Sequence, residues 1–584
     1  MAGQRRARMG RRRFIRLAGG TAAGAAVVGG GTFTAMATGV FESPTPDPFA
    51  NMPRSIALSL PSGTGQSLPL PPLPDPLDGG TVSTPSAVTR IPYTGGTLDP
   101  TETDVPTSLP FEFNKAGYTM NPDLPEALRP WRNRPTAWAN VNLSSGTYHL
   151  NADGVYMYYA KDGNVYDHPV GQIQFGLCCV TSYRVETDPT RKAHFLKRAR
   201  AQADRLIAKR VETRGAWYFP YPFNFTHAEH SGIAYKAPWY SGMAQGEAIS
   251  LFAQLAGLKD GLTDDERAIY RAAADGAFAS LLRGDNAAPW VVNKNRAGYL
   301  WIQEYPFATP GTGDYTYNGM IFAMFGIWDY FQLTGNELAA QLYDGACTTI
   351  ARYFSLVRNP RWFSYYCQTH RIPAHTYHHH HIALWQQMHW HTGSPVFANQ
   401  LDLLIEDVPP AAVKTGASIA IAAGTHTLYQ LSTKSDGNWD KTLADKILGT
   451  KKVTFARATG APIDMRRRIQ GAGVWYRISA GAYKGYWIGE AYPKAFLRGE
   501  HLPVDYIAPR TLTIAANASV EAISFGTNGS AGTLKKVSYS EPHTLQFDRR
   551  AVVNGRSMLR ITSQELAGYW IAANQVTTDE RGSV

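Results

Sequence analysis

Cysteine, charged residues and long apolar runs are all scarce in this sequence. Its 584 residues include four cysteines, too few for a fold held together by disulfides. Beyond residue 40 no stretch of about 20 residues is apolar without Gly or polar interruptions, so we expect no membrane-spanning helix there. Hydrophobic residues nevertheless make up 44% and aromatics 12%, which excludes a largely disordered chain and predicts about two to four folded domains.

Acidic residues are absent from residues 1–37, which contain seven Arg and no Lys. Much of the formal net charge of +11 therefore comes from this segment. Residues 411–584 carry a second excess, with 22 basic and 13 acidic residues, whereas residues 111–410 carry 26 of each. Because the excess lies in two separate segments and no nucleic-acid-binding motif is present, we expect no nucleic-acid partner.

The first 37 residues have the pattern of an export signal. The string R-R-R-F-I-R at residues 11–16 precedes a weakly apolar, Gly- and Ala-rich stretch, and Ala35-Met36-Ala37 offers a cleavage site. This pattern resembles a twin-arginine signal peptide, which implies an exported protein that is extracellular or associated with the cell wall. A basic tail with a short anchor is the alternative. Residues 38–110, rich in Pro, Gly, Ser and Thr, are predicted to form a linker.

The hydrophobic periodicity becomes helical from about residue 171. Helix lengths of about 15–20 residues with short connections predict antiparallel hairpins, so we expect a mainly α domain of α/α toroid type over residues 111–408. Small β-hairpins are predicted on its N-terminal side, near residues 147–163. The predicted helices cover residues 171–185, 191–211, 239–256, 264–282, 316–333, 335–354 and 378–404.

Aromatic and polar residues gather in three connections between these helices, at residues 217–240, 301–317 and 362–381. In a toroid such connections meet at one end and line a cleft. Aromatic faces beside polar groups suit sugar rings, so a carbohydrate cleft is one interpretation, and packing at the rim of the domain is the other.

Four segments resemble the C-terminal catalytic domain of D-glucuronyl C5-epimerases. They read H-P-V-G-Q-I-Q-F-G-L at 168–177, P-W-Y-S-G-M-A-Q-G-E-A-I-S at 238–250, Q-E-Y-P at 303–306 with N-G at 318–319, and Y-H-H-H-H-I at 377–382. The second is the most specific. The resemblance covers about residues 145–405. Eukaryotic members place β-structure before the helical domain, whereas the β-rich part of this sequence follows it.

The resemblance implies a reaction and a set of catalytic residues. The family inverts C5 of a hexuronate within a polysaccharide, converting glucuronate to iduronate. A base must remove the proton α to the carboxylate, and an acid must return one to the opposite face. Glu304, Tyr305 and Tyr377 match the family motifs. A third tyrosine falls on Tyr365 or Tyr366, and its distance from Trp362 favours Tyr365. A tyrosine suits this role if nearby positive charge lowers its pKa from about 10.

The resemblance also suggests residues that hold the substrate. Arg371, His378 and His381 are expected to hold the substrate carboxylate. For Glu304 the alternative is a structural ion pair with Arg296, and for the tyrosines it is capping of a helix. The further predicted substrate-binding residues are Gln174, Trp239, Tyr240, Gln245 and Asn318.

Four consecutive His residues at 378–381 raise the question of a metal. His378 and His381 share a helix face, a spacing that can chelate, but no carboxylate lies within the run. We therefore predict no metal and no cofactor.

A uronate lyase on the same scaffold and a non-catalytic polysaccharide-binding protein are the alternatives to an epimerase. Glycoside hydrolysis is disfavoured because Glu304 has only Glu229 and Asp314 as candidate partners.

Residues 411–584 contain an internal repeat. The strings around G-Y-W-I at 485–488 and 568–571 match at an offset of 83 residues, and K-K-V at 451–453 matches 535–537. We predict two all-β, SH3-like repeats, at 411–505 and 506–584. Basic clusters at 466–468 and 549–550 suggest a site for an anionic or cell-wall polymer, or else a solvated edge.

A disulfide between Cys347 and Cys367 is an open prediction, whereas Cys178 and Cys179 are expected to be buried thiols.

Overall fold

A computed structural model describes residues 96–97, 112–121, 124–130, 149–160, 162–227, 234–284, 288–308, 311–432, 446–526 and 530–579. The predicted signal peptide, nearly all of the predicted linker and Glu229 lie outside the described residues. No helix within these ranges combines the length and the apolarity that a membrane crossing requires.

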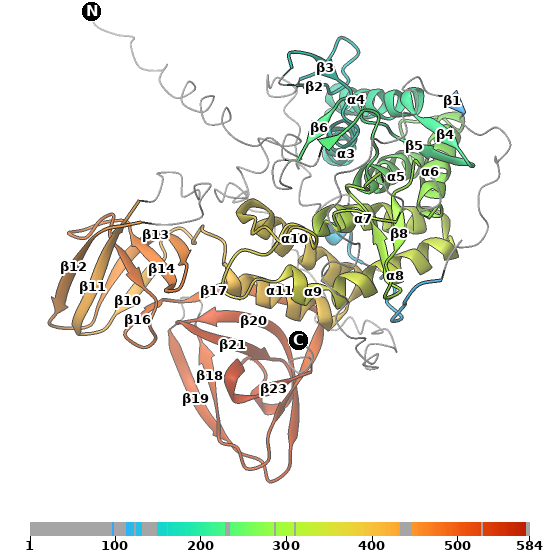
Figure 1. The fold of residues 1–584 in the computed structure, drawn as a ribbon. Helices are drawn as coiled ribbons and strands as arrows, with labels where there is room; N and C mark the ends of the chain where they lie inside the picture. Colours follow the sequence, from blue (N-terminus) through green and yellow to red (C-terminus); the bar gives the residue numbers. More distant parts are fainter. Residues whose placement is uncertain are drawn as a thin grey trace, which may run out of the picture.

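Four helical hairpins form the first domain (Figure 1). Their members are α3 (Pro169–Val185) with α4 (Pro189–Lys209), α5 (Gly242–Ala256) with α6 (Asp264–Leu281), α7 (Tyr317–Thr334) with α8 (Glu337–Arg352), and α10 (His375–Thr392) with α11 (Pro395–Asp407). The short helix α9 (Phe354–Val357) follows α8. Helices α3, α5, α7 and α10 pack against one another in that order, which is the inner layer that a toroid would require. Closure into a toroid stays a prediction.

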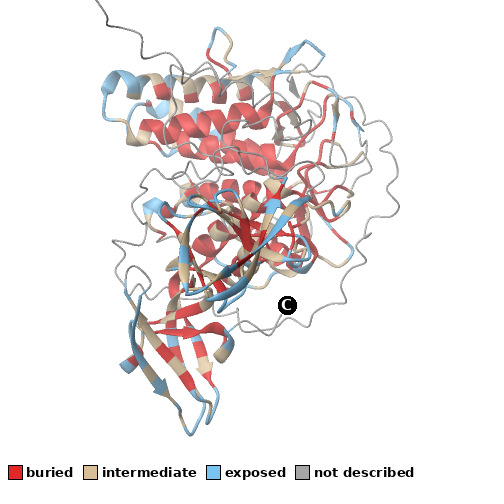
Figure 2. Ribbon diagram, turned by 90° about the vertical axis from the view of Figure 1, so that its left-hand side faces the viewer, coloured by how far each residue is buried: buried red, intermediate tan, exposed pale blue. Residues whose placement is uncertain are grey.

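The inner and outer helices differ in sequence for a physical reason. Nearly every residue of α3, α5 and α7 is buried, whereas α4 and α6 alternate exposed and buried positions and present one apolar face (Figure 2). Helices α5 and α7 approach closely because Gly246 has no side chain. A Cβ at this position would lie 2.2 Å from Cα of Ala323. The T-D-D-E start signal is confirmed as a capping box on α6.

One predicted helix, residues 378–404, was wrong because it is two helices. Gly393 adopts a left-handed conformation and ends α10. Ser394 then caps α11 through the amide of Val396, and Pro395 occupies the first helical position. The string G-S-P therefore encodes a tight turn between antiparallel neighbours.

Short strands occupy the connections around the helices. The pair β2 (Tyr158–Tyr159) and β3 (Val165–Tyr166) forms the hairpin before α3, and β1 (Gly96–Thr97) joins β4 (Val211–Thr213) and β5 (Ala216–Tyr218). Two more pairs are β6 (Phe225–Thr226) with β7 (Ala234–Tyr235) and β8 (Val292–Lys294) with β9 (Leu300–Ile302). The 3₁₀ helix η2 (Glu126–Leu128) lies between β1 and β2 along the chain.

Two sheets with the same strand order follow the helices, and we call them module one and module two. Module one contains β10 (Ser418–Ile421), β11 (Gly424–Leu431), β12 (Ile447–Phe455), β13 (Thr459–Ile469), β14 (Gly473–Ile478), β15 (Trp487–Gly489) and β16 (Ala495–Leu497). Module two contains β17 (Glu500–Ile514), β18 (Val520–Phe525), β19 (Ala531–Val537), β20 (His543–Val553), β21 (Arg556–Ile561), β22 (Trp570–Ala572) and β23 (Thr577–Thr578), with η4 (Gln564–Leu566) and η5 (Ala573–Gln575).

The orders, β12-β11-β15-β14-β13-β10-β16 and β19-β18-β22-β21-β20-β17-β23, are equivalent strand for strand. The sequence repeat is thus a repeat of topology, and assignment to the SH3-like class stays a prediction. Module two begins at Glu500, ahead of the boundary expected at residue 506, because β17 continues back along β20. An ion pair recurs between equivalent strands, Arg477 with Asp464 and Arg560 with Asp548.

Module two shares a hydrophobic core with the helices, where β17 lies along α11 (Figure 1). The Tyr506 hydroxyl donates to Asp402 at 2.8 Å, and Arg510 donates to the Asn399 side chain at 2.8 Å. The imidazole of His389 accepts from the backbone of Ile507 at 3.2 Å. Module two is therefore part of one packed body with the helical domain.

The arginines of the two clusters form hydrogen bonds and ion pairs within the molecule. They are therefore not free to form the open polymer-binding site that their repetition in the sequence suggested. Arg466 donates to the carbonyls of Pro410 and Ala412, and Arg468 donates to those of Glu406 and Asp407 at the end of α11. In module two, Arg549 pairs with Glu500 and Asp505, and Arg550 pairs with Asp402 and Glu406. Cations at a helix C-terminus are electrostatically favoured.

The four cysteines, Cys178, Cys179, Cys347 and Cys367, are buried free thiols. The bridge between Cys347 and Cys367 that the sequence left open is not formed.

The contact between Tyr506 and Asp402 gives a test of this shared core. We expect Tyr506→Phe to lower the free energy of unfolding by about 1–3 kcal/mol, because a buried carboxylate loses a hydrogen bond. Urea unfolding followed by tryptophan fluorescence measures the change. The matched control is Tyr539→Phe, whose hydroxyl donates to exposed Glu565 and should cost less than about 0.5 kcal/mol. Equal losses in both variants would contradict a shared core.

Candidate active site

Glu304 lies in the connection between β9 and α7, held between two inner helices. The amide of Gly242 at the start of α5 donates to the Gln303 carbonyl at 2.7 Å. The Asn318 amide in the first turn of α7 donates to Oε2 of Glu304 at 3.3 Å. The next residue, Gly319, leaves room for the carboxyl, because a Cβ there would lie 2.2 Å from Oε2. The Q-E-Y-P and N-G motifs thus form one structural unit.

Burial raises the pKa of Glu304 to about 8, since its carboxyl is only 3% exposed and cannot be solvated when charged. The negative charges of Asp314 and Glu247 raise this pKa further, while hydrogen bonds from Tyr305 and Asn318 oppose the shift. Gln174 donates to both oxygens of Glu247 at 3.2 Å, so it reaches the site through that carboxylate. At neutral pH most Glu304 side chains are therefore protonated, and the basic form appears as the pH approaches 8.

Aromatic rings surround Tyr305. Its ring stacks on Phe225 at 6.0 Å and lies edge-on to His227 at 4.7 Å between centroids. Trp239 and Tyr235 lie 6.1 and 5.8 Å away. Three of these rings come from the β6–β7 hairpin, which brings the 217–240 connection against the Q-E-Y-P motif.

Tyr366, and not Tyr365, completes the cluster. The ring of Tyr366 contacts that of Tyr377 at 4.4 Å and that of His227 at 5.4 Å, and its phenol interacts with that of Tyr305. Tyr365 instead lies under the guanidinium of Arg371, at 5.0 Å, and is partly exposed. The geometry does not support the preference for Tyr365, because Tyr366 is buried against the other rings whereas Tyr365 bridges to Pro373 and is partly exposed.

The condition of a tyrosine pKa lowered by nearby positive charge is not met for Tyr305 and Tyr366. Burial, together with the negative charge of Glu304, raises the pKa values of Tyr305 and Tyr366 well above 10. These phenols are neutral at physiological pH and are suited to donate protons.

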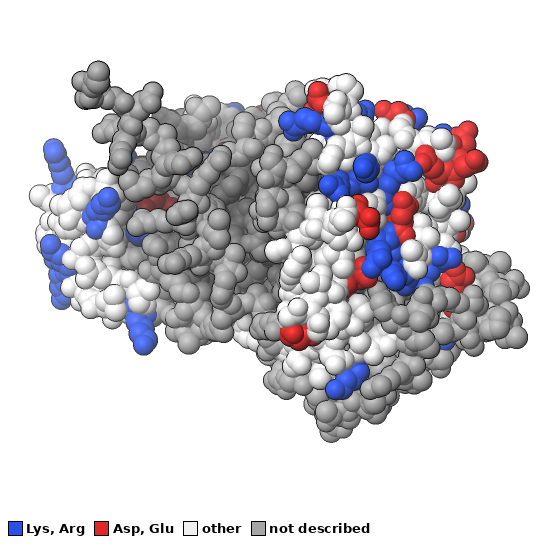
Figure 3. All heavy atoms as spheres, turned by 90° about the horizontal axis from the view of Figure 1, so that it is seen from above, with Lys and Arg blue, Asp and Glu red and all other residues white. Residues whose placement is uncertain are grey.

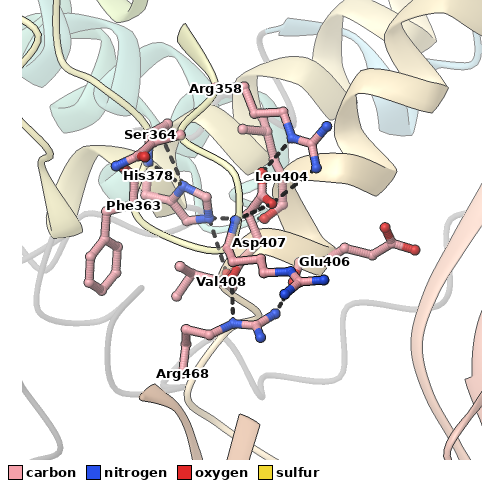
Figure 4. Close-up of polar contacts among 11 residues, drawn as sticks. Arg358, Phe363, Ser364, His378, Leu404, Glu406, Asp407, Val408 and Arg468 are labelled. Carbon is pink, nitrogen blue, oxygen red and sulfur yellow. Dashed lines mark hydrogen bonds and ion pairs between the residues drawn. The ribbon is translucent and has the colours of Figure 1, made fainter. Parts of the chain in front are cut away.

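His378 is a structural residue, although we expected it to bind substrate (Figure 4). Its Nδ1 accepts from the amide of Ser364 at 3.1 Å, so Nε2 carries the hydrogen and donates to the carbonyls of Leu404 and Val408 at 3.0 and 3.1 Å. Burial lowers its pKa to about 4. The ring thereby ties the loop that carries Tyr366 to the end of α11, beside the carbonyls that accept from Arg468.

His381 also contacts this loop and not an open site, since its Nδ1 lies 2.8 Å from the Ser364 hydroxyl. Its pKa is lowered well below the usual value by burial. No group of three His, Cys, Asp or Glu side chains in the described ranges is arranged to hold a metal ion.

Three other residues that we expected to bind substrate, Gln245, Tyr240 and Trp239, contact neighbouring residues of the protein. Gln245 accepts from the amide of Phe219 and donates to the Trp217 carbonyl and the Ser280 hydroxyl, which uses its side-chain amide fully. Tyr240 packs edge-on against Tyr218. Trp239 stacks on Tyr221 at 3.8 Å and donates to the Phe223 carbonyl. It contributes to the wall behind Tyr305.

Sequence reasoning missed His227 and Tyr235 and undervalued Asp314. Burial raises the pKa of Asp314 to about 8, opposed by His370, whose Nδ1 lies 3.7 Å from Oδ1, and by a hydrogen bond from Tyr235. The alternation F-T-H at 225–227 was a usable signal, because both rings then face the same side of a strand. Arg371 is exposed at the edge of the cluster and remains a candidate for holding a carboxylate.

The arrangement defines a class of site. A carboxyl with a raised pKa lies beside a cluster of three phenols, Tyr305, Tyr366 and Tyr377, behind aromatic walls, and such groups take up and return protons at carbon. Residues 212–404 match the family model described as D-glucuronyl C5-epimerase C-terminus. The resemblance seen in the motifs is confirmed over this region, and the match supports a carbohydrate epimerase-like enzyme.

Comparison with whole proteins adds little. Among solved structures, one described as a candidate autolysin from Listeria monocytogenes matches at 14% identity, with a TM-score of 0.13. The match covers 29% of this chain and spans 63% of that chain. At this TM-score it carries no argument about fold or activity. No curated protein matches the chain.

The raised pKa of Glu304 predicts a pH-dependent stability. An unfolded Glu ionises near 4.5, so the folded state loses stability as the pH rises from about 4.5 through 8. Glu304→Gln removes this loss. We expect the melting temperature of Glu304→Gln relative to the wild type to rise between about pH 5 and 8 and to level off above pH 8. Glu337→Gln, at an exposed position on α8, should show a constant difference. A flat difference for both variants would mean that the Glu304 carboxyl is hydrated.

The bonds of His378 predict a second, local effect. We expect His378→Ala to lower the free energy of unfolding by about 1–3 kcal/mol, because the Ser364 amide and two carbonyls of α11 lose a buried partner. His379→Ala is the matched control, since that ring is partly exposed and adjacent on the same helix. Chemical denaturation of both variants gives the comparison, and equal costs would contradict the structural role.

Proposed function

We propose that this protein is an exported enzyme that inverts C5 of hexuronate residues in an anionic polysaccharide, converting glucuronate to iduronate. The observation that carries the proposal is the convergence of Glu304, Tyr305, Tyr366 and Tyr377 in the region that matches the epimerase family. The twin-arginine pattern at residues 11–16 supports export.

The raised pKa values of Glu304, Tyr305 and Tyr366 support the following roles. The ionised fraction of Glu304 removes the C5 proton, and the C–H electron pair moves into the substrate carboxylate to give an enediolate. The phenol of Tyr366 or Tyr377 then gives its proton to the opposite face of C5 as the carboxylate re-forms. Tyr305 interacts with both Glu304 and Tyr366, so it can return the proton from the carboxyl to the phenolate.

Burial serves this chemistry in two ways. A dry carboxyl with a pKa near 8 is a stronger base than one in water, which matches it better to a weakly acidic carbon. Neutral hydrogen-bond donors aimed at the enediolate stabilise its charge more strongly in a low-dielectric site. His227, against the rings of Tyr305 and Tyr366, is a candidate for this second role.

Solvent isotope incorporation tests the reaction. We expect glucuronate-containing polymers incubated with the protein in deuterated water to gain deuterium at C5 and to yield iduronate, detected by NMR. A uronate lyase would instead expel the C4 substituent and form an unsaturated uronate that absorbs in the ultraviolet. Unsaturated product without deuterated iduronate, or no reaction with any uronate polymer, would contradict the proposal.

Two adjacent tyrosines supply a matched pair of variants. Tyr366→Phe should lower kcat at least about 100-fold, because a proton carrier is lost while the ring remains. Tyr365→Phe should retain activity within about threefold, since its ring lies outside the cluster. Rates of deuterium uptake measure both. If Tyr365→Phe were the inactive variant, the assignment of Tyr366 would be wrong.

A further inference from the structure

Exposed cations of module one gather at one end of its sheet. Arg457 lies in the turn that joins β12 to β13, and Lys494 lies directly before β16. Arg498 follows β16, and its guanidinium lies 3.3 Å from the position that a Cβ on Gly460 of β13 would take. The strands that these three side chains flank are neighbours, because β10 pairs with both β13 and β16.

Two lysines and a tyrosine extend this group. The Nζ atom of Lys451 on β12 lies 5.4 Å from the ring centroid of Tyr483, and that ring lies 5.9 Å from Phe455 at the end of β12. Lys484 is the next residue after Tyr483 and is exposed. We call Lys451, Arg457, Lys484, Lys494, Arg498 and Tyr483 the cationic end of module one.

Acidic side chains do not neutralise the cationic end within the described part of module one. That part contains two acids, Asp464 and Glu490. Asp464 accepts two hydrogen bonds from Arg477, at 2.8 and 3.0 Å, and Glu490 interacts with Tyr476 and Arg466 on the side that faces α11. Lys and Arg side chains project from module one on the left of Figure 3.

Module two provides an internal comparison, because it has a lysine equivalent to Lys451 but no comparable excess of cations over acids among its described residues. Lys535, which matches Lys451 in the repeat, lies 4.5 Å from the ring centroid of Tyr569. The amine of Lys535 donates to the Glu565 backbone carbonyl, and the adjacent Lys536 pairs with Glu521 at 3.6 Å. In the described residues, the excess of cations over acids is therefore a property of module one and not of the shared topology.

We propose that the cationic end of module one binds an anionic polysaccharide and holds a long substrate chain near the active site. Within the described residues these five cations have no acidic partner, so they attract carboxylate or sulfate groups, and the Tyr483 ring offers a face on which a sugar can stack. This surface thus replaces the arginine clusters as the predicted binding site of the C-terminal region, because those arginines bind other parts of the protein.

The choice of a polysaccharide over a nucleic acid rests on the proposed function, which gives the helical domain a uronate polymer as substrate. A chain held at the cationic end raises the local concentration of uronate residues at Glu304 without entering the chemistry. Binding should therefore depend on salt and on polymer length, whereas turnover of a short oligosaccharide should not depend on module one.

A charge-neutralised variant of the full chain tests the surface. Lys451→Gln, Lys484→Gln, Lys494→Gln and Arg498→Gln are combined in one variant, and binding to fluorescent high-molecular-mass hyaluronate is measured at two salt concentrations. We expect wild-type binding to weaken steeply with salt and the variant to bind at least about tenfold more weakly at low salt. Tyr483→Ala should weaken binding at both salt concentrations.

The control variant carries Arg191→Gln, Lys197→Gln, Lys209→Gln and Lys259→Gln, which remove as many surface cations from the helical domain and should leave hyaluronate binding unchanged. Loss in both variants would mean general charge attraction, and wild-type binding by the first variant would also overturn the proposal. Equally tight binding of single-stranded DNA would overturn the choice of a polysaccharide. Because binding is measured without turnover, failure of the epimerase assay leaves this result interpretable.

Discussion

The structure depends on the close approach of helices α5 and α7. Side chains are absent where the two meet, at Gly246, and where α7 meets the Q-E-Y-P segment, at Gly319. The connection that carries Glu304 is fixed between the first turns of both helices, by the Gly242 amide and the Asn318 side chain. A larger residue at either glycine would separate the helices and move the carboxyl, so the packing of the inner layer and the geometry of the site are one constraint.

The same burial explains why the pKa values of Glu304 and of the neighbouring Tyr305 and Tyr366 are raised. A carboxyl held against an α7 glycine is shielded from water, and other acids lie near it. Its neutral form is favoured, and the surrounding phenols stay neutral as well. The charges that orient the fold lie elsewhere, at the end of α11, where Arg466 and Arg468 meet backbone carbonyls. The arginine bonds at the end of α11 are thus separate from the ionisable groups of the site, although the buried Glu304 carboxyl also affects stability through its raised pKa.

Much of the fold and part of the site could be predicted from the sequence. Helix positions followed from periodicity, and Glu304, Tyr305 and Tyr377 were found by motif. Sequence could not tell whether His378 and Gln245 face a ligand or hold loops, since both roles use buried polar atoms. The choice between Tyr365 and Tyr366 required the three-dimensional course of the chain, which buries the ring of Tyr366 and places that of Tyr365 under Arg371. The arginine clusters misled because repetition in sequence cannot show which face of a strand another domain covers.

Module two completes the core of the helical domain, and this has a consequence for how the protein can be divided. The region that carries the family match, residues 212–404, ends within α11, whose buried face lies against β17. A fragment cut at that limit would expose an apolar surface and leave Asp402 without Tyr506. A fragment of the helical domain that is to fold alone must therefore include β17 to β23. Module two is in this sense part of the helical domain and not a separable unit.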